Sequence, residues 1–405
     1  MRNVVFVAPY LTTKTLRYVE ALCELEDIAP ALISSHGRDV LPKKLQDPVA
    51  AFVQVDSCLD AEQLSEATRE IAAEIGAVQR LFGVLEQLQL PIAEARDQAG
   101  VPGMGAEVVR RFRDKSAMKK ALRDHGVPCA RFARITGAED ARRFVDEVGF
   151  PVIIKPVAGV GTRATWKLDD DDELAEALSK LGPSEQKPWQ CEEFLVGTEH
   201  SFETVTIDGR HVWSSSTDYI PGPLEAMNTP WIQYCVVLPR ETDSVDEFRE
   251  VNQAALDALG MKAGLSHMEW FRRSDGSVAV NEVGARPPGV NIMPLMSAAY
   301  DTDFVKAWVR LMAKDEFEPP QRVRAAGSAF LKGQGPGDRV VAVDNLDEVL
   351  DKLGDAVVEV SPPRLGSKRA SGYEGEGFVI VAADTTEEVM QALALIIRNV
   401  RVRLG

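Results

Sequence analysis

Short apolar runs and amphipathic stretches alternate along the first part of the chain. Runs at 4–8, 29–34 and 51–55 suit buried strands, and 12–25 and 61–75 carry apolar residues at helical spacing. Strands that alternate with helices predict a parallel α/β layer. The turn after the first strand contains no glycine. Because a dinucleotide fingerprint needs glycines there to let the backbone approach a pyrophosphate, the pattern does not predict NAD or FAD binding.

The pattern changes after Pro102-Gly103, where we expect the first domain boundary. A basic helical segment follows, and Lys115, Lys119 and Lys120 are among its cations. Such a run is typical of a solvated helix face. One of the lysines could instead reach a phosphate, and the spacing alone does not choose between these interpretations.

An apolar strand at 150–156 ends in Lys155 and leads into a loop that contains Gly159, Gly161 and Thr162. A lysine on an apolar strand is costly to bury unless it is paired. Together with the N–H groups of a glycine-bearing loop, it can present positive charge to an anion. The residue order is not that of a P-loop, and an ordinary hairpin turn would show similar letters.

Two strand-like runs flank the turn signal Ser-Asp-Gly-Ser at 274–277 and predict a β-hairpin. If the loop has four residues, Arg273 pairs with Val278, and Glu269 lies opposite Glu282. Opposed residues have Cβ atoms about 4.5–5.5 Å apart, where like charges repel. A divalent cation between the carboxylates would reverse that repulsion, so the hairpin predicts a metal site. The alternative is a solvent-facing hairpin with scattered charges.

Three neighbours of this acidic pair add to the prediction. Arg286 follows Glu282 by four residues on a segment stiffened by two prolines, so its guanidinium could serve a polyphosphate or an anionic intermediate. His267 lies two residues before Glu269 and therefore on the same strand face, either on the substrate side or as a structural histidine. Trp270 points to the other face and is expected in the core.

The rest of the chain predicts an α+β arrangement. The proline-rich stretch at 219–231 is long enough to be a functional loop, which we expect to line an acceptor pocket. Glu318-Pro319-Pro320 ends a domain. The remaining expected elements are helices at 246–259, 303–312 and 387–398 and strands at 325–332 and 377–382.

Composition narrows the class of partner. The chain has 405 residues with a formal net charge of −16, which argues against nucleic acid as a partner. Its five cysteines are scattered, without a C-x-x-C or Cys/His cluster, and predict reduced thiols rather than a zinc site or disulfides. The N-terminal apolar run is too short for a signal peptide, and no run reaches the length of a membrane span. We therefore expect a cytoplasmic protein with no membrane partner.

Four motifs together resemble the ATP-grasp superfamily. They are D-K-x-x-M-K-x-x-L-x-x-x-G-V-P, V-I-I-K-P-x-x-G-x-G, E-E-F-L-x-G-x-E and E-W-F…N-E-V-G-A-R-P-P-G. The last motif and the tail look most like the carboxylate–amine ligases that include bacterial L-amino acid ligases. The resemblance implies an α/β preface domain at 1–103, an ATP-grasp core at 104–320 with a lid at about 124–190, and a small α+β subdomain at 321–405.

The resemblance also implies a role for each matching residue. Lys115 and Lys155 would contact the ATP phosphates, and the glycine-bearing loop would cover them. Glu192 would accept from the adenine amino group, and Glu199 would hold the ribose. The full set of implied nucleotide contacts is Lys115, Lys155, Gly159, Gly161, Thr162, Glu192, Glu193, Leu195 and Glu199. Glu269 and Glu282 would bind magnesium, Lys155 and Arg286 would act in catalysis, and His267, Arg286, Gly289 and Asn291 would face the substrates.

One departure from the family pattern concerns the metal. Many ATP-grasp enzymes have asparagine two residues after the second metal-binding glutamate, where this chain has Gly284. A second ion would then need water, Asn281 or Asn291. The implied cofactors are ATP and one or two Mg²⁺ ions, which Mn²⁺ can replace.

The implied function is ATP-dependent ligation of a small carboxylate to an amine through an acyl phosphate. The alternatives are a biotin-carboxylase-like enzyme and a nucleotide-binding module without catalysis. The tail would complete either the active site or a homodimer interface.

Overall fold

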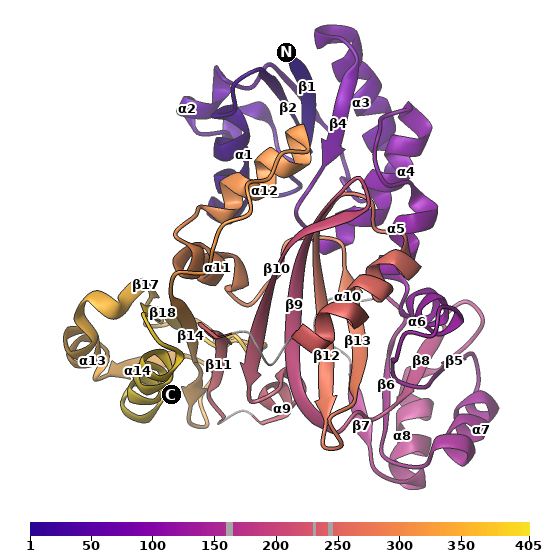
Figure 1. Cartoon of the computed structure of the whole chain (residues 1–405), viewed down its shortest axis with the longest axis vertical. Coiled ribbons are helices and arrows are strands. Elements are labelled where there is room, and N and C mark those ends of the chain that lie inside the picture. The colour runs from indigo at the N-terminus through magenta and orange to yellow at the C-terminus, as the bar shows by residue number, and fades with distance from the viewer. Residues whose placement is uncertain (159–164, 230–231, 242–245) are drawn as a thin grey trace.

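The computed structural model describes residues 1–158, 165–229, 232–241 and 246–405, the last with side chains from 248 onward. Four sheets divide the chain into a preface, a lid, a large central sheet and a tail (Figure 1). Among the described helices, none is both long and apolar enough to cross a bilayer.

The preface is a parallel sheet of order β3-β2-β1-β4 covered by helices, as the alternating pattern predicts. The strands are β1 (Arg2–Val7), β2 (Ile28–Ser34), β3 (Ala51–Gln54) and β4 (Val78–Phe82), and the helices are α1 (Thr13–Cys23), α2 (Lys43–Gln46), α3 (Ala61–Ile75) and α4 (Gln89–Ala99). Every residue of β2 is buried, which is typical of a strand covered on both faces. The chain leaves β4 through the 3₁₀ helix η2 (Glu86–Leu88), which carries Glu86 toward the centre of the molecule.

The basic segment forms two helices, α5 (Ala106–Arg113) and α6 (Lys115–Asp124), where the sequence predicted one. Asp114 separates them because its backbone is extended and its side chain caps α6, accepting from the N–H groups of Ser116 and Ala117. Beyond α6 lies the lid, a sheet of order β5-β8-β6-β7 with two helices. Its elements are β5 (Phe132–Ile135), α7 (Ala138–Val148), β6 (Val152–Pro156), β7 (Trp166–Leu168), α8 (Asp171–Leu181) and β8 (Trp189–Glu193).

The central sheet has the order β13-β12-β9-β10-β11-β14-β18-β17. Its core strands are β9 (Gly197–Ile207), β10 (Arg210–Ile220), β11 (Tyr234–Leu238), β12 (Gly264–Arg273) and β13 (Val278–Gly284). Helices α10 (Asp246–Leu259), α11 (Ile292–Tyr300) and α12 (Phe304–Lys314) belong to the same part of the chain. Trp270 is fully buried and stacks on Phe248 of α10, as the face assignment predicts.

The tail continues this sheet because β14 (Ala325–Leu331) pairs with β11. Strands β18 (Gly377–Ala383) and β17 (Val357–Ser361) follow at the edge, beyond the boundary expected at 320. Helices α13 (Leu346–Leu353) and α14 (Thr386–Asn399) and a second small sheet complete the tail. That sheet consists of β15 (Gly333–Gln334), β19 (Arg401–Leu404) and β16 (Val340–Asp344).

Two local predictions need correction. The stretch at 219–231 is not one long loop, because it contains the end of β10 and the helix α9 (Pro223–Asn228). In the hairpin, Val278 pairs with Arg272 rather than Arg273. A β-bulge then inserts Asn281 between the pairs Trp270–Val280 and Glu269–Glu282. The extra residue restores the predicted opposition of the two glutamates.

Candidate functional site

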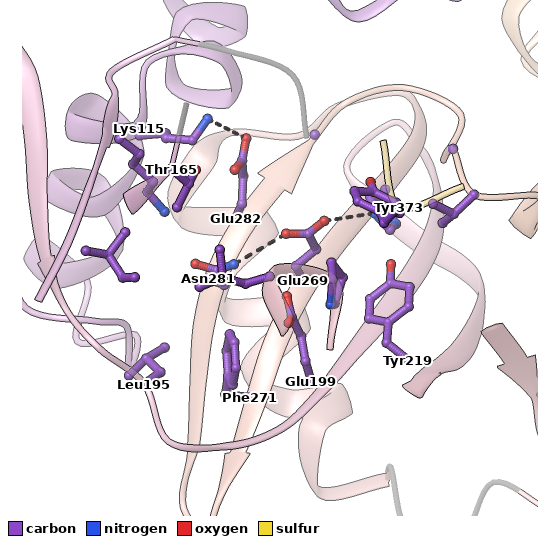
Figure 2. A pocket seen from close by; sticks show the side chains of 18 of the residues that line it. Lys115, Thr165, Leu195, Glu199, Tyr219, Glu269, Phe271, Asn281, Glu282 and Tyr373 are labelled. Atoms are coloured by element: carbon purple, nitrogen blue, oxygen red, sulfur yellow. Dashed lines mark hydrogen bonds and ion pairs between the residues drawn. The ribbon is translucent and has the colours of Figure 1, made fainter. Parts of the chain in front are cut away.

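A cleft lies between the lid and the central sheet, and most of the predicted site residues line it (Figure 2). The lid and its preceding helix contribute Lys115, Lys155, Glu192, Glu193 and Leu195, and the central sheet contributes Glu199, His267, Glu269 and Glu282, with Arg286 and Gly289 just beyond it. Gly159, Gly161 and Thr162 lie outside the described residues, and Thr165 beyond them lines the cleft. Asn291 donates to the Ser328 hydroxyl on β14 at 3.1 Å.

The register of β12 fixes which side chains share the cleft face. Glu269 lies opposite Glu282 on β13 and opposite Ser201 on β9. Because side chains alternate along a strand, His267 and Phe271 lie on the same face as Glu269. Figure 2 shows Glu269 and Glu282 side by side in the cleft, with Asn281 beside them.

The two carboxylates have different partners. Glu282 accepts from the Lys115 ammonium at 2.9 Å, while Glu269 accepts from the Asn281 amide at 3.3 Å. Burial alone would raise the pKa of Glu282, but Lys115 and then Lys155 outweigh it and lower the pKa to about 2. Glu282 is therefore ionised at neutral pH.

The donor set fits a magnesium ion that also binds a nucleotide. Mg²⁺ prefers oxygen ligands and often takes only one or two carboxylates, with water and phosphate oxygens for the rest. Glu269 and Glu282 supply those two, and the bulge brings the Asn281 amide to the same place. Among the described residues, no three or more His, Cys, Asp and Glu side chains are grouped so that they could hold a metal ion by themselves.

Gly284 lies opposite His267 at the position where the family pattern has asparagine. A Cβ atom there would lie 3.7 Å from Cγ of Arg286, which is ordinary van der Waals contact. Space therefore does not dictate glycine at this position.

A buried cluster of charges surrounds Glu192. Its carboxylate lies 2.9 Å from the Lys155 ammonium and 3.5 Å from that of Lys119, and Gln190 also donates to it. Burial raises the pKa of Glu192, but the two lysines outweigh this effect and hold it below its usual value. An adenine amino group that donates to Glu192 would have to share the carboxylate with Lys155, Lys119 and Gln190.

The structure separates the lysines of the basic segment, which the sequence left undecided. Lys115 and Lys119 are buried, four residues apart on one face of α6. Lys120 is solvent-exposed and pairs with Asp124. Burial lowers the pKa of Lys119, whereas for Lys155 the carboxylates of Glu192 and Glu282 outweigh the effect of burial and raise the pKa. Lys155 is therefore the more firmly charged of the two.

One end of the cleft is apolar, with Ile153, Phe194, Leu195 and Phe271 among its lining residues. The backbone N–H of Glu193 donates to the carbonyl of Arg131 at 3.0 Å. Because this N–H is already paired, the backbone of Glu193 would contact a nucleotide base through its carbonyl oxygen.

Glu199 is buried on the cleft face of β9, opposite Phe271. Burial, and then the charge of Glu269, raise the pKa of Glu199 well above its usual value. A hydroxyl-bearing ligand would satisfy this carboxyl group better than an anion would.

Arg286 reaches back to the preface domain, a contact that sequence reasoning missed. Its Nε and Nη2 atoms both lie 2.6 Å from Oε2 of Glu86, and Arg113 donates to the other oxygen. Burial lowers the pKa of Arg286, but Glu86 outweighs it and raises the pKa. No local motif marks Glu86, because the contact spans 200 residues of sequence.

His267 is held between two carboxylates. Its Nδ1 donates to Glu203 at 2.8 Å, and its Nε2 lies 3.7 Å from Oε1 of Glu269. Burial lowers the pKa of His267, but the hydrogen bond to Glu203 and the nearby charge of Glu269 outweigh it and raise the pKa to about 9. His267 is thus an imidazolium at neutral pH, next to one of the two opposed glutamates.

Taken together, the cleft has an apolar end, a cationic wall and an acidic pair on one side of a hairpin. This arrangement can hold a flat ring, a polyphosphate and a divalent cation in that order along the cleft. Arg286 places a further guanidinium beyond the acidic pair, where charge on a reacting carboxylate or phosphate would gather.

Comparison with known proteins agrees with this fold. Residues 120–295 match the family model described as the ATP-grasp domain. An L-arginine-specific L-amino acid ligase of Bacillus subtilis is 25% identical over 252 residues, which cover 61% of this chain and 60% of that protein. An alanine–anticapsin ligase of Bacillus subtilis (strain 168) is 24% identical over 307 residues, covering 68% of this chain and 64% of that protein.

Solved structures cover the chain from end to end. The L-amino acid ligase from Bacillus licheniformis has a TM-score of 0.78 at 20% identity, covering 100% of this chain and 99% of that one. N5-carboxyaminoimidazole ribonucleotide synthetase from Thermotoga maritima has a TM-score of 0.70 at 15% identity, with both chains covered completely. These likenesses concern the fold, and the chain spans less than two thirds of the L-arginine-specific ligase in sequence.

Proposed function

We propose, on the premise that this chain is an ATP-grasp protein with the fold its motifs predict, that it is an ATP-dependent carboxylate–amine ligase. A substrate carboxylate oxygen attacks the γ-phosphorus of ATP, the bond to the bridging oxygen breaks, and ADP leaves. The resulting acyl phosphate is attacked at its acyl carbon by an amine, which loses a proton as phosphate departs. The products are an amide, ADP and phosphate.

One observation carries the proposal, namely the opposition of Glu269 and Glu282 in a cleft that also contains Lys115, Lys155 and Arg286. Two carboxylates on directly opposed strand residues repel each other unless a cation lies between them or beside them. The ammonium groups of Lys115 and Lys155 and the Arg286 guanidinium now pair with protein carboxylates, and a bound phosphate chain could share them.

Glu269 and Glu282 would hold Mg²⁺, with the Asn281 amide nearby as a further oxygen donor. The ion supplies positive charge to the polyphosphate when it is bound. Lys115 would exchange its ion pair with Glu282 for a phosphate oxygen. The apolar end at Ile153, Leu195 and Phe271 would take the adenine ring.

The remaining nucleotide roles follow the family pattern. Glu192 and the backbone of Glu193 and Leu195 would read the adenine edge, Glu199 would hold the ribose, and Gly159, Gly161 and Thr162 would cover the phosphates.

Lys155 and Arg286 would neutralise the charge that develops at the reacting atoms. Glu86 fixes the Arg286 guanidinium through two contacts to one oxygen. Because catalysis of phosphoryl transfer is mainly positioning and charge neutralisation, no enzyme nucleophile is required.

Phosphate release against a matrix of small carboxylates and amines tests the proposal. Activity that requires one of each, lost in both Glu269→Gln and Glu282→Gln but kept in the exposed Glu66→Gln, is the expected result. ADP formation that depends on bicarbonate and biotin would instead support the carboxylase alternative. ATP binding without ADP formation for any pair would indicate a non-catalytic module, and full activity of Glu282→Gln would refute the metal assignment.

A further inference from the structure

Three tyrosines from distant parts of the sequence line the cleft at its substrate end. Tyr219 is at the end of β10, Tyr234 opens β11, and Tyr373 lies in the loop before β18. Figure 2 shows Tyr219 and Tyr373 on the far side of Glu269 from Lys115. The tail therefore contributes directly to this end of the cleft.

The three rings form one packed unit. Tyr219 stacks on Tyr234 with ring centroids 6.3 Å apart, and Tyr373 meets Tyr234 edge-on at 5.2 Å. Tyr234 also stacks on Phe330 of β14 at 5.4 Å, which anchors the unit in the central sheet. This packing holds the rings rigidly, and the half-buried Tyr373 presents its ring to the cleft.

The hydroxyl of Tyr234 is the unusual feature of this unit. Tyr234 has no exposed surface, and its hydroxyl finds no hydrogen-bond partner among the described residues. A buried hydroxyl without a partner is costly, and phenylalanine would fill the same space without that cost. Tyr234 lines the cleft, so a small shift of the residues around its hydroxyl would let a polar atom of a ligand pair with it.

The charge around the tyrosines limits what can enter. Glu199, Glu269 and Glu374 line the same cleft. Burial, and then the charge of Glu269, raise the pKa of both Tyr219 and Tyr373. Arg286 is close enough to act on Tyr373 as well, so this end adjoins the acyl-transfer centre of the proposed reaction. An additional negative charge on the ligand would be repelled by the carboxylates.

We propose that Tyr219, Tyr234 and Tyr373 form a substrate subsite for an aromatic amino acid whose ring carries one hydrogen-bonding atom, such as a phenol, imidazole or indole. This inference rests on the proposed function, since an amino acid carries both groups that the ligation joins. The negative charges of Glu269 and Glu374 exclude acidic side chains. Small aliphatic side chains are disfavoured because they leave the Tyr234 hydroxyl unpaired.

The test compares L-tyrosine with L-phenylalanine as probes. Phosphate release is measured with each, together with L-leucine and L-aspartate, for the wild type, Tyr234→Phe, Tyr373→Leu and the exposed control Tyr10→Phe. We expect Tyr234→Phe to lower kcat/KM for L-tyrosine about tenfold and to leave that for L-phenylalanine unchanged, which is the scale of one hydrogen bond. Tyr373→Leu should lower both, and Tyr10→Phe neither.

A second readout separates this inference from the ligase proposal. Calorimetric binding of L-tyrosine and L-phenylalanine in the presence of MgADP does not need turnover. If L-tyrosine binds more tightly and Tyr234→Phe removes the difference, the subsite stands even if no amide forms. Turnover restricted to small or acidic amino acids, or equal losses for both probes in Tyr234→Phe, would overturn the subsite and leave the ligation in place.

Discussion

Replacing Glu282 with glutamine should destabilise the protein when no metal or nucleotide is bound. In that state the Glu282 carboxylate forms an ion pair with the buried Lys115, and this attraction outweighs its repulsion from Glu269. Lys115 lies 2.9 Å away, and the side chains of Lys115 and Glu282 are only 7% and 26% exposed. The variant keeps the shape of the side chain and removes its charge.

The pKa of Glu282 sets the size of the effect. Burial opposes ionisation, but Lys115 and Lys155 lower the pKa from 4.5 to about 2. At about 1.4 kcal/mol for each unit of pKa, the ionised form gains roughly 3 kcal/mol from folding. Because several cations share the interaction, this figure is an upper estimate.

The sign of the pH dependence follows from the lowered pKa. The stabilisation is fully present above pH 4.5, the value of the unperturbed group, and is lost as the pH falls toward about 2. The wild type and Glu282→Gln should therefore differ most at neutral pH, and their free energies of unfolding should converge in acid.

Urea unfolding with a metal chelator present measures the difference. We expect the free energy of unfolding of Glu282→Gln to be lower by up to about 3 kcal/mol at pH 7, and that of the exposed Glu66→Gln to change by less than about 0.5 kcal/mol. An equally stable or more stable Glu282→Gln would refute the reasoning. It would mean that repulsion from Glu269, rather than attraction to Lys115, dominates at Glu282.

Four further changes test other parts of the site. Glu86→Gln should lower kcat more than it raises KM, because the Arg286 guanidinium loses the carboxylate that orients it, and Glu86→Asp should recover part of the loss in the same kinetic assay. Gly284→Asn should fold normally, since space allows a Cβ, and should tighten Mg²⁺ binding in a calorimetric titration, whereas weaker binding would contradict this. The wild type should lose stability between pH 7 and 10 as the pH passes the raised pKa of His267 at about 9, and His267→Gln should show a smaller loss in melting temperature. Lys119→Met should lower the free energy of unfolding by about 1–3 kcal/mol, because Glu192 loses one buried donor but keeps Lys155, and an unchanged urea midpoint would contradict that.

The resemblance of four motifs implied the ATP-grasp fold, and local patterns predicted several residues of the cleft. Strand alternation placed Glu269 and His267 on one face and Trp270 on the other, and the apolar strand predicted a paired, buried Lys155. These predictions succeed because the alternation of side chains along a strand and the cost of burying a charge are local properties.

In the hairpin, the predicted opposition of Glu269 and Glu282 is correct, although the strand register next to the turn differs from the predicted one. Arg273 lies opposite Ser277 instead of Val278, so the loop is one residue shorter than predicted, and the extra residue at the Asn281 bulge compensates for it. A bulge depends on what the strand packs against, and nothing in the residues 266–289 marks it.

The sequence alone determined the order of the motifs and the opposition of the acidic pair, because each depends on residue type and short spacing, and the resemblance of the motifs implied the proposed chemistry. Only the tertiary structure decided which lysines of α6 face inward, that Glu86 of the preface holds Arg286, and that Tyr373 of the tail meets Tyr219 and Tyr234. These contacts join segments far apart in the chain, and such packing is set by how the sheets and domains meet rather than by any pattern within a segment.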